Sequence, residues 1–490
     1  MNKITKYNQY FIGIIVFILP FLEFIKNNIS EIDIILVKSF YFLFITLLFF
    51  LILFSISINR FIKKLNFSEV FIISSLSYWL IFKHNLININ LKRLFEQFNS
   101  FLTVYSAEIG ILIILILIFF IYFLIKRKNL FFLRFISIFI ILSFLINLID
   151  IYNGTKADNL KKNFSKEIIF KDNLNSKKNN IYFFILDAMQ PIEDFENYYN
   201  INLGDFNKFI KNYEYEYKKD TTNLYDNTTH GLSAIFYLQD IFDKDNKLKQ
   251  QTNILYPTLL RKENQSILIN NLDYLEYDFK WIGNYFAYCP KFNLKYCLNE
   301  KNNSYFDTYL YINFFRQTPL IQLITNVAHM VNYDFNKNFF YRLNDGLGRL
   351  RNHLESNDDI SKKNPTFFFV HHMSPHWPYI TSNDCSYNYY PGKKNYEGYE
   401  NSYLCVLKKI KETIIFLNKN DPDATIIFQS DHNWPMSQNK KEKKRIFNLY
   451  KIDETCKKQN EINLNNVNML RLVFACMTGN DPNYIKYNLN

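Results

Sequence analysis

The sequence predicts a multi-span α-helical membrane domain followed by an α/β domain, in which a largely parallel sheet lies between layers of helices. The chain has 490 residues, 18% of them aromatic, and its Phe, Ile and Leu residues crowd into positions 1–152. From Asn153 the chain becomes rich in Asn, Lys, Asp and Tyr, and three short apolar runs there have the length of buried strands. We therefore expect a transmembrane domain at 1–152, a linker at 153–178 and the α/β domain at 179–490.

The membrane domain is expected to contain about five helices. Ser39–Ile58 is a run of 20 residues without a charge, which is long enough to cross a hydrocarbon core about 30 Å thick. Ile109–Ile125 is a second clear span that ends in three basic residues. Three weaker candidates complete the set: Tyr7–Leu22, Val70–Phe82 and Phe131–Ile149.

Basic residues between these spans predict their orientation. Lys3 and Lys6, the group Arg60 to Lys64, and the run 126–128 should lie on the cytoplasmic side. Five crossings then place the N-terminus inside and everything after Tyr152 outside the cytoplasmic membrane. The span at Val70–Phe82 decides this result, because its loss would make the number of crossings even.

The net charge of +12 does not indicate a nucleic-acid-binding protein. Residues 1–150 contain 14 Lys and Arg against 7 Asp and Glu, so much of the excess flanks membrane spans. The remaining excess is spread through a Lys-rich chain and forms one short basic run, at 440–445.

The six cysteines favour an oxidising compartment. All of them follow residue 152, and taken in order they form pairs spaced by 8, 20 and 20 residues: Cys289 with Cys297, Cys385 with Cys405, and Cys456 with Cys476. Three local disulfides are the simplest interpretation, although six cysteines allow 15 pairings. Metal binding is the alternative, but the sequence has no CxxC motif. An external location follows from the disulfides independently of the charge pattern.

Chemically active residues follow each apolar run of the α/β domain. Ile181–Leu186 ends in Asp187, Phe367–Val370 ends in His371, and Ala424–Phe428 is soon followed by Asp431. Ligands of open α/β sheets bind outside the carboxyl ends of the strands. The sequence therefore predicts one site that contains these residues together with their neighbours His372, His376 and His432.

Carboxylates and imidazoles without thiolates are typical ligands of one divalent cation, with Zn²⁺ or Mn²⁺ favoured over Mg²⁺. Such a cation can acidify a hydroxyl group and neutralise a phosphoryl group. The candidate hydroxyl belongs to Thr228, or else to Thr229, in a polar turn before the helix that starts near Gly231. The alternative is that one of these threonines only caps the helix.

Five segments of the chain form a series of motifs: IYFFILDA (181–188), YDNTTHGLSA (225–234), FFFVHHMSPHWPY (367–379), IIFQSDHN (426–433) and VNMLRLVFAC (467–476). In this order they resemble the membrane-anchored members of the alkaline phosphatase/sulfatase superfamily, which include lipoteichoic acid synthases and phosphoethanolamine transferases. The resemblance implies that the α/β domain is a sulfatase-like, or alkaline phosphatase-like, domain.

The resemblance implies roles for individual residues. The implied metal ligands are Asp187, Thr228, Asp431 and His432. Thr228 would also be the nucleophile that forms a phospho-threonine intermediate. The implied catalytic and substrate-binding histidines are His371 and His376, with His372 as a further candidate for binding substrate.

The chain departs from the family pattern at three points. Ala188 follows Asp187 where two-metal sulfatases have adjacent acids, so we expect one tightly bound metal. Asn433 stands where Gly is usual, which Asn tolerates because it accepts a left-handed backbone. The chain lacks the C/S-x-P-x-R motif of true sulfatases, which argues against sulfate ester hydrolysis.

The function implied is transfer of a phosphoryl-linked head group, of phosphoethanolamine or phosphoglycerol type, from a membrane lipid to an envelope glycan or lipid. We expect a monomer in the cytoplasmic (inner) membrane, with its catalytic domain on the periplasmic side. One alternative is a hydrolase or phosphodiesterase that uses water as the acceptor. Another is an anchored binding protein whose site has lost its activity.

Overall fold

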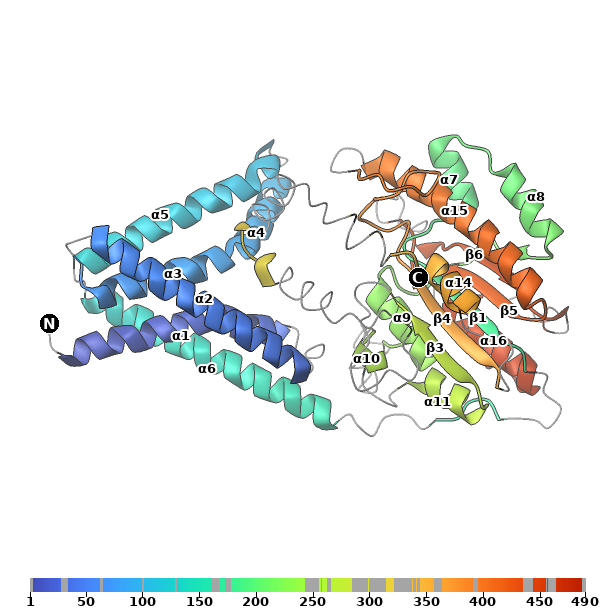
Figure 1. Cartoon of the computed structure of the whole chain (residues 1–490), viewed down its shortest axis with the longest axis horizontal. Helices are drawn as coiled ribbons and strands as arrows, with labels where there is room; N and C mark the ends of the chain where they lie inside the picture. The colour runs from blue at the N-terminus through green and yellow to red at the C-terminus, as the bar shows by residue number, and fades with distance from the viewer. Residues whose placement is uncertain are drawn as a thin grey trace. The chain divides into compact units, whose positions relative to one another are not determined.

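The computed structural model consists of two compact units (Figure 1). Unit 1 comprises Met1–Leu160 and Asn303–Tyr333, and unit 2 comprises Lys161–Asn302 and Asp334–Asn490. The structure describes residues 3–27, 34–61, 65–98, 101–127, 130–160, 167–171, 178–242, 255–256, 258–261, 266–283, 298, 314–320, 337, 341, 344–356, 364–390, 395–434, 444–454, 456 and 464–486.

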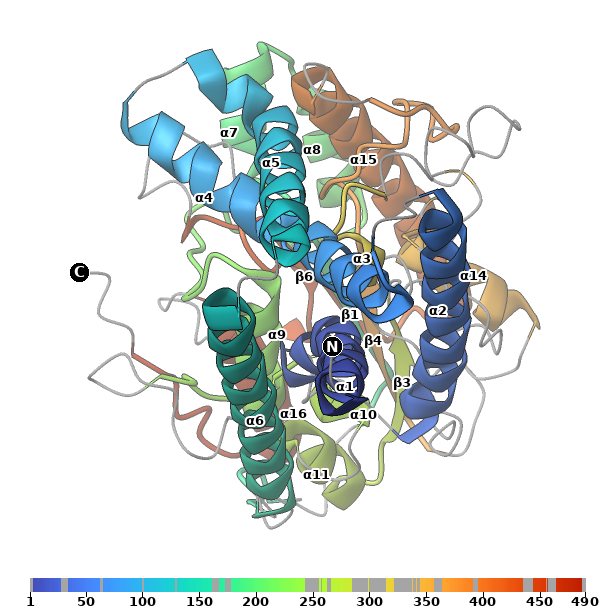
Figure 2. The ribbon, with the colours of Figure 1, turned by 90° about the vertical axis from the view of Figure 1, so that its left-hand side faces the viewer.

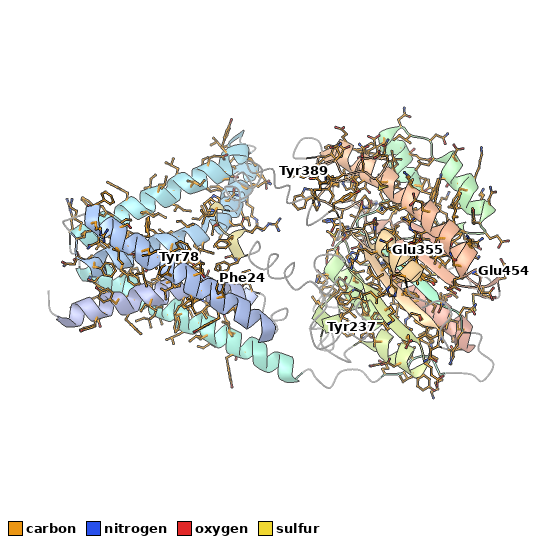
Figure 3. All side chains as sticks on the ribbon, in the orientation of Figure 1. Phe24, Tyr78, Tyr237, Glu355, Tyr389 and Glu454 are labelled. Carbon is orange, nitrogen blue, oxygen red and sulfur yellow. A yellow bond between two sulfur atoms is a disulfide. The ribbon has the colours of Figure 1, made fainter. Side chains whose placement is uncertain are left out.

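Unit 1 is a bundle of apolar helices. Its elements are α1 (Lys3–Asn27), α2 (Ile34–Phe61), α3 (Phe67–Phe82), α4 (His84–Gln97), the short 3-10 helix η1 (Phe101–Tyr105), α5 (Ser106–Lys126) and α6 (Leu130–Leu160). α1 packs between α3 and α6 (Figure 2). The bundle interior is aromatic, and Phe24 and Tyr78 are labelled within it in Figure 3.

Four of these helices, α1, α2, α5 and α6, are long and apolar enough to cross a membrane. α5 leaves large apolar side chains such as Phe119 and Phe120 exposed, as expected for a helix that faces lipid. α3, which contains the predicted span Val70–Phe82, has 16 residues and continues into α4 across a 47° bend. The described residues therefore contain four such helices, or up to five if the bent pair counts as one span. By length and composition, unit 1 is a helical membrane domain.

Residues 314–320 pack with the membrane helices, although the sequence assigned them to the α/β domain. Phe314 is fully buried, and its ring centroid lies 4.7 Å from those of Phe21 and Phe82. The carbonyl of Gln317 accepts a hydrogen bond from the N–H of Asn85 at 3.1 Å. The helix α6 also extends to Leu160, past the expected boundary at residue 152.

Unit 2 is built on a six-stranded sheet with the strand order β2-β6-β5-β1-β4-β3. The four strands β5, β1, β4 and β3 run parallel to one another. At one side of the sheet β6 pairs antiparallel with β5, and β2 pairs antiparallel with β6. The sheet is therefore largely parallel, as predicted. Their bounds are β1 Ile181–Leu186, β2 Glu216–Tyr217, β3 Asp278–Ile282, β4 Thr366–His372, β5 Thr425–Ser430 and β6 Asn448–Lys451.

Helices cover both faces of this sheet (Figure 1). The strand side chains Ile181, Phe183 and Ile185 pack against α9 (Thr228–Tyr237), α11 (Ile267–Tyr274) and α16 (Asn466–Thr478). The alternate side chains of β1 pack against α7 (Ile192–Tyr199), α8 (Gly204–Asn212), α14 (Gly346–Ser356) and α15 (Asn395–Asn420). A short helix, α10 (Thr258–Arg261), completes the unit. β1 is buried on both faces, which explains why its sequence IYFFIL has no polar alternation.

Two of the three predicted disulfides are present in unit 2. Cys385 is bonded to Cys405, and Cys456 is bonded to Cys476. The predicted partners Cys289 and Cys297 lie outside the described residues. The two bonds confirm the local pairing expected from the spacing of 20 residues.

Candidate metal centre

The carboxyl ends of β1, β4 and β5 meet at one edge of the sheet. Leu186 at the end of β1 is level with His372 of β4 and with Ser430 of β5. The next residues, Asp187 and Asp431, therefore leave the sheet side by side. The N–H of Asp187 also donates to the carbonyl of His372 at 3.0 Å, which fixes the start of this loop.

Asp187 is the centre of the site. Its Oδ2 lies 3.1 Å from Nε2 of His371, and its Oδ1 lies 3.4 Å from Nε2 of His432. Burial alone would raise the pKa of Asp187, but the charge of His376 and hydrogen bonds from His371 and His432 hold that pKa well below its usual range. Asp187 is therefore an ionised carboxylate although it is buried.

Asp431 provides the second buried carboxylate. Its Oδ1 accepts hydrogen bonds from the N–H groups of Ala188 at 3.1 Å and His432 at 2.9 Å. Its Oδ2 is buried without a hydrogen-bond donor among the described residues, and Nε2 of His432 lies 3.6 Å from it. A buried carboxylate oxygen without a donor is costly unless a cation is nearby. This oxygen therefore fits a metal site.

Two overlapping groups of side chains have the spacing needed to hold an ion. Possible ligand atoms of Asp187, His376 and His432 all lie within 4.8 Å of one another, and so do those of Asp187, His371 and Asp431. Asp187 belongs to both groups. Carboxylate oxygens and imidazole nitrogens at this spacing suit one divalent cation.

Burial alone would lower the pKa of the His432 imidazole, but the carboxylates of Asp431 and Asp187 raise it to about 10. A protonated His432 thus carries the positive charge that these two carboxylates require. A bound cation would take over this role and release the proton, because only the neutral imidazole can be a ligand.

Thr228 occupies the first position of α9, at the same site. Its Oγ1 lies 3.3 Å from Nε2 of His432 and 3.5 Å from Oδ1 of Asp187. The helix is capped by Asn227, whose side chain accepts a hydrogen bond from the N–H of His230. The Thr228 hydroxyl is therefore not the cap, which was the alternative to a role in the site. Thr229 is exposed.

The three histidines after β4 lie in different surroundings. His371 is fully buried between Asp187 and Tyr256, whose hydroxyl lies 3.1 Å from Nδ1 of the ring. His372 points to the opposite face of β4, where burial lowers its pKa to about 4 and keeps it neutral. His376 is half-buried, and its ring centroid lies 6.1 Å from that of His432. Of the three, His376 is the least buried.

Two of the three departures from the family pattern can be followed in the structure. Ala188 adopts a left-handed conformation with φ of 59°, and its N–H donates to Oδ1 of Asp431. Its side chain is a methyl group, so this position adds no further carboxylate to the site. Asn433, in contrast, is not among the residues with a left-handed backbone. Its side chain instead accepts a hydrogen bond from the N–H of Trp434 at 2.6 Å, so the expected reason for tolerating Asn here was wrong.

The sequence did not identify three residues that support the site. The side chain of Asn223 donates to the carbonyl of Asp431, Tyr256 contacts His371, and Asp345 lies 3.7 Å from Nδ1 of His372. None of them follows a predicted strand or lies within one of the five motifs. Only the folded chain brings them to the edge of the sheet.

No family model and no curated protein matches this chain. Several solved structures are similar to it at low identity. The integral membrane protein lipooligosaccharide phosphoethanolamine transferase A (EptA) from Neisseria meningitidis is 13% identical with a TM-score of 0.39, over 93% of this chain and 89% of that chain. The soluble domain of the same transferase is 14% identical with a TM-score of 0.41, over 64% of this chain and 91% of that chain.

A third similar structure is the C-terminal periplasmic domain of EcEptC from Escherichia coli in complex with Zn. It is 13% identical with a TM-score of 0.38, over 61% of this chain and 79% of that chain.

Proposed function

We propose that this protein is a metal-dependent transferase that moves a phosphoryl-linked head group from a membrane lipid to an envelope glycan or lipid. The head group is of phosphoethanolamine or phosphoglycerol type. One observation carries the proposal: the Thr228 hydroxyl lies within 3.5 Å of both Asp187 and His432, beside a buried Asp431 oxygen that has no described donor. The order of the five motifs supports the same reading.

The ion would be held by Asp187, Thr228, Asp431 and His432, with Zn²⁺ or Mn²⁺ favoured. When bound, it would neutralise phosphate charge and acidify the Thr228 hydroxyl. His371 orients one of these ligands, because its hydrogen bond to Oδ2 of Asp187 leaves Oδ1 directed at the ion site.

The protein residues then divide the reaction between them. The first N–H groups of α9 face the phosphate anion, as at other helix N-termini. The Thr228 hydroxyl loses its proton to solvent as its oxygen forms a bond to phosphorus. The bond between phosphorus and the lipid oxygen breaks, and His376 gives this leaving oxygen a proton.

A phospho-threonine at position 228 is the result of this first step. In the second step His376, neutral after the first step, takes the proton of an acceptor hydroxyl as that oxygen attacks the phosphorus; the bond to Thr228 breaks, and the Thr228 oxygen takes a proton from solvent. Water in place of the acceptor would make the protein a hydrolase. Acceptor dependence is therefore the property that separates a transferase from a phosphodiesterase.

Unit 1 would hold the protein in the cytoplasmic membrane, with unit 2 on the periplasmic side. The support is the apolar helices together with the two disulfides of unit 2, because disulfides persist in oxidising compartments. Anchoring in the membrane suits a lipid donor.

The test uses the full chain purified in detergent, loaded with Zn²⁺ or Mn²⁺, and a phospholipid labelled in its head group. Thr228→Ala should reduce release of labelled head group by at least about 10³-fold, since a nucleophile has no substitute. Thr229→Ala is the matched control and should retain activity. Mass spectrometry should find the label on Thr228 when no acceptor is added.

Equal activity of wild type and Thr228→Ala would overturn the proposed mechanism. Release that is independent of every added sugar or lipid acceptor would favour the hydrolase. Protein that binds no metal and releases no head group would favour an anchored binding protein.

A further inference from the structure

A cavity of about 240 Å³ opens beside the candidate metal centre, on the other face of β4. His372 and His376 both line it, so the cavity begins at a residue of the metal centre. The remaining walls come from the start of α14, the middle of α15 and the loop after β4. The volume lies below the roughly 300–1,000 Å³ of pockets for drug-sized ligands, so the cavity suits a small group.

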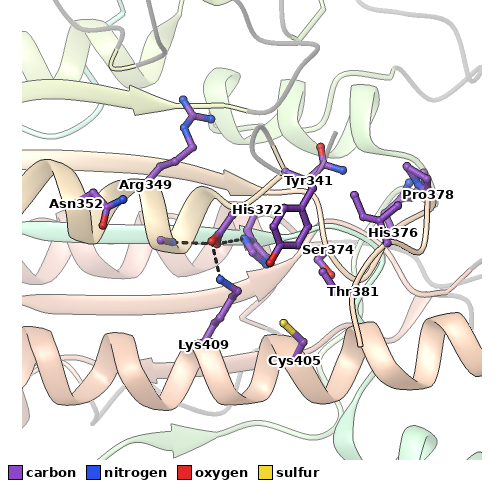
Figure 4. A pocket seen from close by; sticks show the side chains of 14 residues that line it. Tyr341, Arg349, Asn352, His372, Ser374, His376, Pro378, Thr381, Cys405 and Lys409 are labelled. Carbon is purple, nitrogen blue, oxygen red and sulfur yellow. Dashed lines mark hydrogen bonds and ion pairs between the residues drawn. The ribbon is translucent and has the colours of Figure 1, made fainter. Parts of the chain in front are cut away.

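Figure 4 labels Lys409 and Arg349, the basic side chains that line this cavity, and the cavity is also lined by the acidic side chain of Asp345. Its Oδ2 lies 2.6 Å from Nζ of Lys409, and its Oδ1 accepts a hydrogen bond from the N–H of Gly348 at 3.0 Å. Both oxygens of the carboxylate are therefore engaged. Arg349 adds a second positive side chain, so two cations and one engaged anion line the cavity. A further positive group would find no unpaired carboxylate among these described residues.

Two of the residues that line the cavity each have a buried polar atom without a hydrogen-bond partner among the described residues: Nε2 of His372 and Oδ1 of Asn344. The N–H of Leu347 points at Nδ1 of His372 at 3.4 Å, which assigns the proton of the neutral ring to Nε2. One unpaired atom is therefore a donor and the other an acceptor. A hydroxyl group can satisfy both kinds, whereas an ammonium only donates.

We propose that this cavity binds an uncharged hydroxylated group, either glycerol or one sugar unit, attached to the phosphate at the metal centre, and that it disfavours an ethanolammonium group. This inference rests on the proposed function and selects among its substrates. The hydroxyl side chains of Ser374 and Thr381 in the cavity wall suit the same kind of ligand.

The glycerol could belong to the lipid head group, and the sugar to the acceptor. The first arm of the test therefore compares two soluble nitrophenyl phosphodiesters that differ only in carrying glycerol or ethanolamine. The second arm keeps one diester and compares a methyl glucoside with its amino-sugar analogue as acceptor. If the cavity binds the donor head group, wild-type full-length protein should favour the uncharged diester by about tenfold in kcat/KM in the first arm; if it binds the acceptor, the same preference for the uncharged sugar should be seen in the second arm.

Lys409→Met should remove that preference, because it frees the Asp345 carboxylate to receive an ammonium. Lys408→Met is the matched control, since this neighbouring lysine is exposed and does not line the cavity. Asn344→Asp is nearly isosteric and adds a carboxylate to the cavity, so it provides a second variant should Lys409→Met not fold. Like Lys409→Met, Asn344→Asp should reduce the preference for the uncharged partner over the ammonium-bearing one.

A change in the first arm alone assigns the cavity to the donor, and a change in the second arm alone assigns it to the acceptor. Equal use of charged and uncharged partners by wild type, or no effect of either cavity variant, would overturn the inference.

If no diester reacts, the proposed function fails, and the inference is then tested by ligand binding without turnover. Glycerol 1-phosphate should raise the Tm of the full chain more than phosphoethanolamine does, and Asn344→Asp should remove the difference; equal shifts in wild type would overturn it.

Discussion

Two adjacent residues at the end of β4 belong to different environments. His371 is directed to one face of the sheet, where it contacts Asp187 and joins the metal centre. His372 is directed to the other face, where it lines the cavity with Asp345 and Lys409. This alternation follows from the geometry of a strand, in which successive side chains point to opposite faces. One strand end therefore supplies both the proposed chemistry and the proposed selection of substrate.

The largest effect is expected from removing the carboxylate of Asp431, whose Oδ2 has no hydrogen-bond donor among the described residues. Asp431→Asn should abolish metal binding and lower head-group release by roughly 10³-fold, because the cation loses one of two buried carboxylates. Metal analysis of the purified protein and activity measure the two effects. Asp421→Asn is the control, since Asp421 accepts hydrogen bonds from Asn180 and Tyr182 at the opposite end of β1. Metal binding that survives in Asp431→Asn would remove Asp431 from the site.

A pair of neighbouring variants would test the comparison directly. His371→Gln should weaken metal binding by roughly 10–100-fold, as expected for a residue that orients a ligand. His372→Gln should leave the metal in place and change mainly KM, since His372 lies on the cavity side. Titration with Zn²⁺ and steady-state kinetics separate these outcomes. Identical effects of the two variants would show that the faces are not independent.

The metal-free protein should lose stability as the pH rises. The folded-state pKa of His432 is about 10, above its ordinary value of 6.5, so its contribution to stability is complete below pH 6.5 and is lost as the pH rises towards 10. The Tm of metal-free protein in detergent should fall over this range. His432→Gln should flatten this dependence, and an unchanged slope in that variant would contradict the assignment.

Tyr256→Phe should have the smallest effect of the series. It removes the hydroxyl next to Nδ1 of His371 and keeps the packing of the ring, which should cost about 1 kcal/mol. The expected change in metal affinity is below tenfold. A measurable drop in Zn²⁺ affinity with unchanged KM would place Tyr256 on the metal side of β4, whereas a change in KM alone would place it on the cavity side.

The sequence predicted those parts of the site that depend on strands. The apolar run before Asp187 and the one before Asp431 mark central parallel strands, and the ends of such strands share an edge of the sheet. Thr228 could be placed near that edge only by resemblance, because nothing in its local sequence distinguishes it from a helix cap. The structure shows that Thr228 is not the cap of α9, because the side chain of Asn227 accepts the hydrogen bond from the N–H of His230.

The parts that the sequence did not predict depend on pairing between distant segments. Asp345 directly precedes α14 and Lys409 lies in the middle of α15, and in the sequence neither differs from an ordinary surface charge. Their ion pair exists only because both helices pack on the same face of the sheet. Phe314 presents the same difficulty, since the short aromatic stretch that contains it gives no sign that it packs with helices more than 200 residues earlier.

The burial of Phe314 among the membrane helices has a consequence for how the two units can be separated. The chain passes between unit 1 and unit 2 three times, because residues 303–333 return to unit 1. A single proteolytic cut between Leu160 and Asn180 would leave unit 2 joined to the bundle through the peptide that carries Phe314. Release of unit 2 as a free fragment therefore requires additional cuts, on both sides of that peptide.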